Sequence, residues 1–398
     1  MIWKGVSKKM YNYISLFSGA GGLDIGIERS GFNLVSMCEI EKVFCETLEA
    51  NKGWTHCDGK DYFQNTKIIN ADIKEVGSSE LTCGENIDLI VGGPPCQAFS
   101  SSGKQLSVLD PRGALVTEFH RVVEEVKPRM FLFENVRGIV TARDANGNPG
   151  GVITSILEYF EEIGYSCRTA LLNSADYGSH QRRVRCFIIG SLKGLAPTFP
   201  KPTHSKSALA NNSLFEKPWN TLGQFLEEHF DRDKENYTYP TYNMAAQLEG
   251  IKDGSGLKSM GKAEKTRPGG HWGYRQGTFI ADLNLPARTV TGSSSQDWVR
   301  WDGDLRRLTL KEVQMLQGFP ADWVVKGKRT EVFKQIGNAV PTVFGEKLGE
   351  LLMQHLDNFP ATNPVFIEMP KSYKGYIEYT RKDHERNKDS RTVHKQFK

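Results

Sequence analysis

The amino-acid sequence predicts an α/β protein, in which an open, mainly parallel sheet flanked by helices is followed by a second, smaller and loop-rich domain. Between residues 11 and 192, short apolar runs end in glycine or polar residues and alternate with helical patterns, as in doubly wound sheets. After Ser191 the chain becomes rich in Pro, Asn, Lys, Gly and Ser, with weak periodicity to about residue 285. That change of composition marks the second domain.

Composition is that of a soluble globular protein with room for two domains. The chain has 398 residues, of which 38% are hydrophobic and 25% charged, and we find no apolar run as long as a membrane span. We therefore expect a cytoplasmic protein. Its seven cysteines are widely spaced and include no C-x-x-C pair, which argues against a disulfide scaffold and against a zinc cluster or other metal site.

The first predicted strand, residues 13–17, leads into a glycine turn at residues 18–22 and then into a helix that closes at Gly31. Doubly wound sheets hold nucleotides with this unit. The dinucleotide pattern G-x-G-x-x-G is incomplete, because Asp24 occupies the position of its third glycine. The backbone can therefore approach a ligand closely, but the turn does not demand a pyrophosphate.

Two carboxylates follow the next two predicted strands. Residues 33–38 end at Glu39, about 20 residues beyond the glycine turn, where an acidic residue commonly holds ribose hydroxyls. Residues 67–71 end at Asp72. Either carboxylate alone is more often a solvated loop residue or a helix N-cap. Together with the turn, they predict a nucleoside site without phosphates.

A cysteine follows the strand predicted at residues 87–91. The Gly-Gly-Pro-Pro run at residues 92–95 turns the backbone sharply and then stiffens it, which holds Cys96 at the carboxyl end of the strand. This thiol is either a nucleophile or a buried structural cysteine. The next buried strand, residues 129–133, ends at Glu134. If the two strands are parallel, Glu134 and Cys96 lie at the same edge of the sheet.

A last pair of strands is predicted at residues 166–172 and 185–190. Alternation places Arg183 and Arg185 on one face. Two arginines on one face usually mark a wet sheet edge, whereas beside a carboxylate they could clamp an anion or a substrate.

Regular patterning returns with a capped helix from Thr309 and an amphipathic helix at residues 342–356. The predicted division is a sheet domain at 11–192, completed by 330–358, a small domain at 193–329 and a basic tail at 359–398. Residues 371–398 contain nine Lys or Arg and four Asp or Glu residues. We expect them to be solvated, although they could contact nucleic acid electrostatically.

Six sequence blocks, in the same order and at similar spacing, resemble the C5-cytosine-specific DNA methyltransferase family of prokaryotic restriction-modification type. The blocks are Phe17-Ser18-Gly19-Ala20-Gly21-Gly22, Gly93-Pro94-Pro95-Cys96-Gln97, Glu134-Asn135-Val136, residues 181–185, Arg288-Thr289-Val290-Thr291 and residues 335–341. The resemblance implies a Rossmann-like sheet that binds S-adenosyl-L-methionine and a small target-recognition domain. The acceptor is then a cytosine flipped out of double-stranded DNA, and S-adenosyl-L-homocysteine is the product.

The resemblance also implies roles for the site residues. Cys96 adds to carbon 6 of the cytosine, and a protonated Glu134 meets the charge that develops on ring nitrogen 3. Arg183 contacts the flipped base, and Arg185 orders Glu134. The implied cofactor-binding residues are Phe17, Gly19, Ala20, Gly21, Gly22, Glu39, Ile40, Asp72, Ile73, Pro94, Asn338 and Ala339. The implied DNA contacts are Gln97, Ser100, Ser102, Arg275 and Arg288.

Three alternatives remain open. The same chemistry could act on tRNA, although the long variable region argues for a DNA-reading surface. The chain could bind DNA without catalysis, but binding alone does not need the thiol. A cysteine hydrolase is disfavoured, because no histidine falls in the strand-end motifs. We expect a monomer associated with the nucleoid, and a cognate restriction endonuclease, if present, would act separately.

Overall fold

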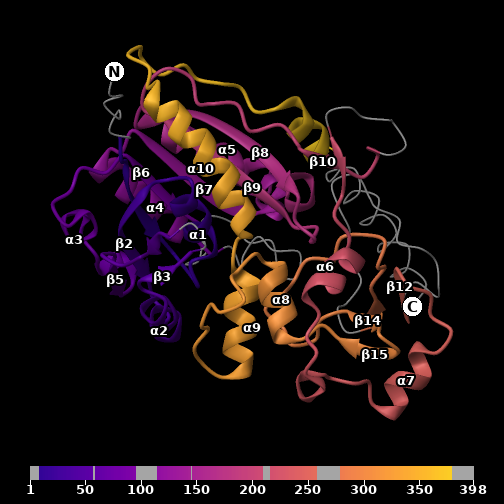
Figure 1. The fold of residues 1–398 in the computed structure, drawn as a ribbon. Helices are drawn as coiled ribbons and strands as arrows, with labels where there is room; N and C mark the ends of the chain where they lie inside the picture. Colours follow the sequence, from indigo (N-terminus) through magenta and orange to yellow (C-terminus); the bar gives the residue numbers. More distant parts are fainter. Residues whose placement is uncertain are drawn as a thin grey trace, which may run out of the picture.

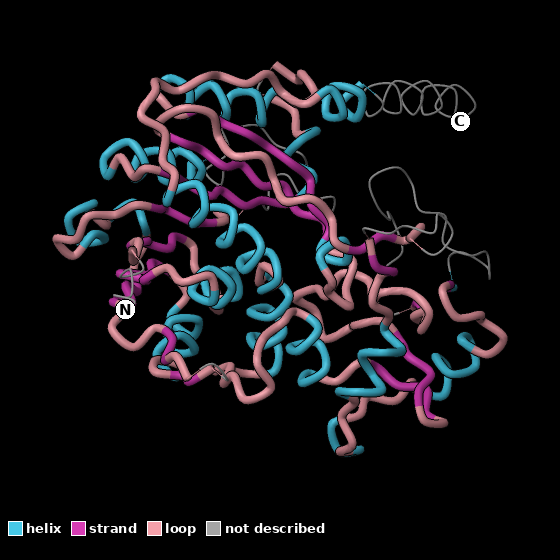
Figure 2. The backbone as a smooth tube through the Cα atoms, turned by 45° about the horizontal axis from the view of Figure 1, so that its top comes forward, coloured by secondary structure: helices cyan, strands magenta, loops and turns pink. Residues whose placement is uncertain are grey.

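The computed structural model describes residues 9–56, 59–95, 114–144, 146–208, 216–257 and 278–378. In these ranges, helices cover both faces of one large sheet (Figure 1). A group of shorter elements lies apart from that sheet (Figure 2). The structure thus has the two-part organisation that the change of composition indicates.

Seven strands of the described chain form the large sheet, in the order β5, β2, β1, β6, β7, β9 and β8. Their bounds are β1 Asn12–Leu16, β2 Asn33–Glu39, β5 Lys67–Asn70, β6 Leu89–Gly92, β7 Met130–Val136, β8 Ser166–Asn173 and β9 Val184–Ser191. The first five in this order are parallel, and β9 is antiparallel to β7 and β8. Every strand predicted from the sequence in this region is present.

The order of the strands reverses at β1. From β1 the chain adds β2 and β5 on one side, and it then returns to add β6 and β7 on the other. Ligands of open α/β sheets bind outside the carboxyl ends of the strands at such a point. The glycine turn and Asp72 follow such strands, Glu39 ends β2, and Glu134 lies near the end of β7, which continues to Val136.

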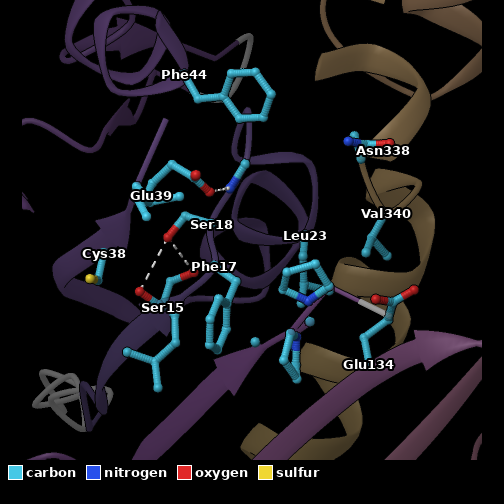
Figure 3. Close-up of a pocket in the computed structure, with 18 of the residues that line it drawn as sticks. Ser15, Phe17, Ser18, Leu23, Cys38, Glu39, Phe44, Glu134, Asn338 and Val340 are labelled. Carbon is cyan, nitrogen blue, oxygen red and sulfur yellow. Dashed lines mark hydrogen bonds between the residues drawn. The ribbon is translucent and has the colours of Figure 1, made fainter. Parts of the chain in front are cut away.

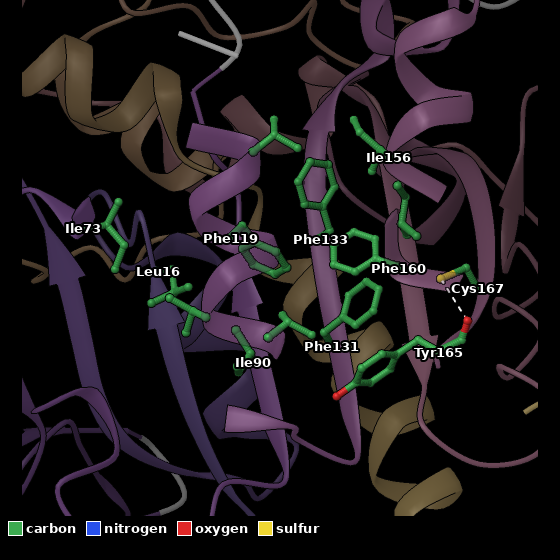
Figure 4. Packing of buried hydrophobic residues seen from close by; sticks show 14 of the residues in the cluster. Leu16, Ile73, Ile90, Phe119, Phe131, Phe133, Ile156, Phe160, Tyr165 and Cys167 are labelled. Carbon is green, nitrogen blue, oxygen red and sulfur yellow. Dashed lines mark hydrogen bonds between the residues drawn. The ribbon is translucent and has the colours of Figure 1, made fainter. Parts of the chain in front are cut away.

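Alternating side chains fill both faces of the sheet. Ile90 and Phe131 face a layer of α3 (Ser78–Thr82), α4 (Ala114–Val126) and α5 (Gly151–Glu162), where aromatic rings such as Phe119 and Phe160 gather (Figure 4). Val91 and Leu132 face the opposite layer of α1 (Gly22–Arg29) and α10 (Thr342–Asp357). Burial on both faces explains why these strands are continuously apolar.

The helix nearest the C-terminal end of the sheet domain packs directly on the first helix. A Cβ at Gly26 of α1 would lie 2.2 Å from the Thr342 carbonyl oxygen, and one at Gly345 of α10 would lie 2.2 Å from the Leu23 carbonyl oxygen. Only glycine permits this approach of two backbones. The close packing brings residues 335–341, far along the chain, back to the glycine turn.

The smaller unit has a hydrophobic core of its own. Leu226, Val299, Val313 and Phe333 are among its buried residues, and an ion pair between Arg306 and Glu312, 2.7 Å long, is fully buried within it. Its elements and those linking it to the sheet are β10 His204–Ser205, β11 Lys217–Pro218, α6 Leu222–His229, α7 Tyr242–Leu248, β12 Ser255–Gly256, β13 Phe279–Ile280, β14 Trp298–Trp301, β15 Asp304–Arg307, α8 Leu310–Leu316 and α9 Arg329–Asn338. Helix α9 shares this core, although the predicted division assigns it to the sheet domain.

The remaining short elements lie around the large sheet. They are α2 Lys42–Ala50, the pair β3 Trp54–Thr55 and β4 Asp61–Tyr62, and 3-10 helices at Ile73–Glu75, Arg137–Thr141 and Ser174–Tyr177. The smaller unit has one further 3-10 helix among the described residues, Lys234–Asn236. No helix in the described ranges is long and apolar enough to cross a membrane.

One side of the helix at residues 371–378 is packed against the protein, so the expectation of a solvated tail is wrong for Tyr373, whereas Lys371, Ser372, Lys374 and Gly375 are exposed. This segment is helical throughout, and Tyr373 is only 3% exposed. Its hydroxyl accepts a hydrogen bond from Thr169 Oγ1 at 3.4 Å, and Tyr376 lies under the guanidinium of Arg137. The two tyrosines are three residues apart and therefore share one side of the helix. A count of charged residues does not detect such an apolar side.

Replacing Tyr373 by alanine should lower the free energy of unfolding by about 3 kcal/mol, because it empties a large buried site. Urea denaturation of the full chain measures the change. Tyr242 is 88% exposed, and Tyr242→Ala should change stability by no more than about 0.5 kcal/mol. Equal effects of the two substitutions would contradict the packing of the tail.

Candidate active site

A cavity of about 630 Å³ opens at the carboxyl ends of β1, β2, β6 and β7 (Figure 3). The connection between α9 and α10 forms its opposite wall. This volume is typical of a site for a small-molecule ligand. The predicted site residues that line it are Phe17, Gly19, Gly22, Glu39, Ile40, Asp72, Ile73, Pro94, Glu134, Arg183, Arg185, Asn338 and Ala339.

Two predicted cofactor-binding residues of the described chain, Ala20 and Gly21, are not part of the cavity lining. Ala20 and Gly21 belong to the glycine turn behind its wall, where Gly21 adopts a left-handed conformation (φ 80°) as the N-cap of α1. The residues Cys96, Gln97, Ser100, Ser102 and Arg275 lie outside the described residues. Their assigned roles therefore stay predictions.

Glu39 holds the glycine turn against the end of β2. One carboxylate oxygen, Oε2, accepts a hydrogen bond from the Gly19 amide at 2.9 Å, and Oε1 accepts one from the Glu41 amide at 2.9 Å. Burial raises the pKa of this carboxyl, and the two amide donors oppose that rise. Glu39 therefore fixes the position of the glycine turn in the cavity wall.

Asp72 caps a short helix at the edge of the cavity. It accepts a hydrogen bond from the Lys74 amide at 3.1 Å as the N-cap of a 3-10 helix, and it also lines the cavity. Ile73 beside it is buried, whereas Ile40 on the neighbouring strand end is 61% exposed. The cavity wall therefore offers carboxylates and apolar side chains together.

Glu134 lies where the parallel pairing of β6 and β7 places it. Gly92 is the partner of Phe133 across these strands, so the next residue on each strand, Gly93 and Glu134, meet at the edge of the sheet. Glu134 is 8% exposed, and Arg185 Nε lies 3.0 Å from its Oε1. Burial raises the pKa of Glu134, while the charges of Arg185 and Arg183 act to lower it.

Arg183 is a buried connector. Its two terminal nitrogens donate to the carbonyl oxygens of Val290, at 2.7 Å, and Gly337, at 2.6 Å. These carbonyls belong to the sequence blocks at residues 288–291 and 335–341, so Arg183 joins both of them to its own block at residues 181–185. Contact with a flipped base stays a prediction for this residue.

Asn135 positions the backbone just ahead of Cys96. Its side-chain amide donates to the Pro94 carbonyl oxygen at 3.2 Å. The peptide that leads into Cys96 is therefore tied to β7, the strand that carries Glu134.

Sequence reasoning did not give two buried glutamines the importance that their contacts have. Gln181 accepts a hydrogen bond from the Val290 amide at 2.9 Å and donates to Gln317 Oε1 at 2.8 Å. Gln317 in turn donates to the Ile336 carbonyl oxygen at 2.6 Å. No local signal marked Gln181 as buried, because its neighbours His180 and Arg182 are polar, whereas Gln317 follows the apolar Leu316.

Arg288 lies in a structural contact away from the cavity. Its guanidinium is 4.1 Å from the centre of the Phe279 ring and forms an ion pair with Asp297 at 3.2 Å. Its side chain is 12% exposed. The contact with DNA implied for Arg288 stays a prediction.

Taken together, the described residues of the cavity combine the carboxylates of Glu39 and Asp72, which suit a nucleoside-like ligand, with a further carboxyl, Glu134, and two arginines. Figure 3 shows Glu39 and Glu134 at opposite sides of the view. A carboxyl with a raised pKa is suited to donate a proton to a substrate atom.

Comparison with known proteins shows which family the chain belongs to. The family model described as C-5 cytosine-specific DNA methylase matches residues 11–354. Type II methyltransferase M1.HphI of Haemophilus parahaemolyticus is 31% identical over 347 residues, which are 86% of each chain. Type II methyltransferase M.FnuDI of Fusobacterium nucleatum is 32% identical over 346 residues, 82% of this chain and 90% of that one.

Solved structures agree in fold. The Entamoeba histolytica methyltransferase EhMeth has a TM-score of 0.61 at 16% identity, and the S. pombe Dnmt2 methyltransferase has one of 0.59 at 17% identity. Each comparison covers 87% of this chain and 99% of the other. The predicted Rossmann-like methyltransferase sheet is confirmed, and the chain belongs to the C-5 cytosine-specific DNA methylase family.

Proposed function

We propose that this family member is the modification enzyme of a restriction-modification system. It transfers a methyl group from S-adenosyl-L-methionine to carbon 5 of a cytosine within one short sequence of double-stranded DNA. The observation that carries this proposal is the buried Glu134–Arg185 pair beside the Gly93-Pro94-Pro95 turn. The names of the relatives, Type II methyltransferases, support the assignment to a modification system.

The cavity fits the proposed methyl donor. Its wall combines the apolar side chains of Phe17, Ile73 and Pro94 with the carboxylates of Glu39 and Asp72, a set suited to a nucleoside and its hydroxyls rather than to phosphate. A Cβ at Gly19 would meet no atom within 4 Å, so the turn leaves space for a ligand. The residues that would hold the donor are Phe17, Gly19, Gly22, Glu39, Ile40, Asp72, Ile73, Pro94, Asn338 and Ala339. When bound, the donor supplies an electrophilic methyl group on a positively charged sulfur.

The chain's own residues activate the cytosine. The Cys96 thiolate forms a bond to carbon 6, and the electron pair displaced from the ring double bond moves toward ring nitrogen 3. Glu134 supplies the proton that neutralises this nitrogen, which leaves carbon 5 nucleophilic. Burial suits Glu134 to this role because it raises the carboxyl pKa.

The target cytosine must leave the DNA stack to reach this cavity. The small unit at residues 193–329 is proposed to read the DNA sequence, and its separate core allows its surface to vary without disturbing the sheet. This unit favours DNA over tRNA as the substrate. The intact Glu134–Arg185 pair disfavours a protein that only binds DNA.

Incubation of the full chain with labelled S-adenosyl-L-methionine and mixed duplex DNA tests the proposal. We expect label in DNA, and bisulfite sequencing should show protected cytosines within one recurring short sequence. Glu134→Gln should slow turnover by about 100-fold or more, whereas Glu28→Gln, a substitution of a half-buried glutamate outside the cavity, should not. Label in tRNA but not in DNA would replace this proposal with the tRNA alternative.

The pH dependence of kcat/KM should change when the charge of Arg185 is removed. Arg185→Met removes a charge that lowers the Glu134 pKa, so that pKa should rise. Because the protonated acid is the active form, the alkaline limb of the kcat/KM profile should move to higher pH while the maximum falls. Arg185→Lys keeps the charge and should leave the limb in place. A limb that does not move in Arg185→Met would rule out Glu134 as the titrating acid.

Gly93 should tolerate no side chain. A Cβ there would lie 2.5 Å from Glu134 Oε2, so Gly93→Ala must displace the acid from its position. We expect kcat to fall about 100-fold with DNA binding retained. Gly375, whose Cβ would meet nothing within 4 Å, provides the control, and Gly375→Ala should keep full activity. Normal turnover by Gly93→Ala would contradict the placement of Glu134.

A further inference from the structure

A buried carboxyl that the proposed mechanism does not use lies beside the donor cavity. Asp24, in the first turn of α1, lines the cavity and is 1% exposed. Among the described residues, its Oδ1 atom has no hydrogen-bond partner. An unpartnered buried carboxylate oxygen costs free energy, and an apolar residue or the glycine of the dinucleotide pattern would avoid that cost.

Two serines connect Asp24 to the glycine turn. Ser15 lies next to the Asp24 carboxyl, whose pKa it acts to lower, and Ser18 Oγ lies 3.0 Å from Ser15 Oγ. Both serines line the cavity, where Figure 3 shows them next to each other. The three side chains form a continuous polar path from the cavity wall to the buried carboxyl.

Few other charges act on this carboxyl. Burial is the largest influence and raises the Asp24 pKa to about 7, while Ser15 and Tyr13 act to lower it. Glu28, one turn further along α1, has its pKa raised to about 8, also by burial. The charged or titratable groups on the surrounding elements are Tyr13 on β1, Glu28 on α1, Lys60 beside Glu28, Glu346 and Lys347 on α10, and Cys38, Glu39, Glu41, Asp72, Lys74, Glu134, Arg183, Arg185 and Lys334 around the cavity.

We propose that Asp24 is a positioning residue that acts, through Ser15 and Ser18, as the buried counter-charge for the positively charged part of the methyl donor. The inference rests on the proposed function, because it assumes S-adenosyl-L-methionine as the ligand. The donor carries a sulfonium charge that its product, S-adenosyl-L-homocysteine, lacks. An ionised Asp24 therefore favours the donor over the product and helps the spent cofactor to leave.

The sign of the pH effect follows from this charge. In the free protein Asp24 is mainly protonated below pH 7 and ionised above it. A nearby cation favours the ionised form, so binding of the donor lowers the Asp24 pKa and releases a proton, whereas binding of the product does not. Glu39 and Glu134 line the same cavity, so the contribution of Asp24 is the difference between the unmodified protein and Asp24→Asn.

Isothermal titration of the full chain with donor and with product, between about pH 6 and about pH 8, tests the inference. We expect the ratio of product Kd to donor Kd to rise about tenfold over this range, as for a pKa change of about one unit. In buffers with different heats of ionisation, donor binding should release more protons than product binding. Asp24→Asn should abolish both effects.

Two further variants keep the test decisive. Ser15→Ala interrupts the polar path and should weaken the pH dependence, even if Asp24→Asn does not fold. Glu28→Gln removes a neighbouring half-buried carboxyl outside the cavity and should leave the pH dependence intact. Tight binding of both ligands with a constant Kd ratio, or an unchanged pH dependence in Asp24→Asn, would overturn the role of Asp24 alone. Binding of neither ligand by the unmodified protein would overturn the proposed function as well.

Discussion

The parallel pairing of β6 with β7 is the constraint on which the site depends. It places Gly93 directly against Glu134, and the absence of a side chain at Gly93 leaves the space that the carboxylate occupies. The same edge receives Arg185 from β9, through the antiparallel pairing that opposes Val136 and Arg185. A shift of one residue between these strands would turn Glu134 to the opposite face of the sheet, and the cavity would lose its buried acid.

Buried polar side chains hold the two parts of the molecule in one arrangement. Arg183 bonds to backbone carbonyls at Val290 and Gly337, and Gln181 connects to Val290 and Gln317. Burying these groups is favourable only because each finds partners. The unit proposed to read DNA is thereby connected to residues that line the cavity. The site is complete only when this unit and the sheet domain are both in place.

Much of the fold and site could be predicted from local sequence patterns. Apolar runs located the strands, and the residues that end them, Glu39, Asp72 and Glu134, were correctly expected at one edge of the sheet. The packing of Tyr373 could not be predicted, because its partners Thr169 and Cys186 are about 200 residues away and no local pattern encodes such a contact. The connecting role of Arg183 depends in the same way on distant carbonyls.

The sequence by itself determined the strands, the order of the motif blocks and the kinds of chemical group available, because these follow from local periodicity and side-chain chemistry. Only the tertiary structure decided what each group contacts. It gave Glu39 the task of holding the glycine turn, made Arg183 a connector, and left Asp24 buried with an unpartnered oxygen beside the cavity. Burial and partners set the pKa and the orientation of a side chain, and both arise from residues that are far apart along the chain.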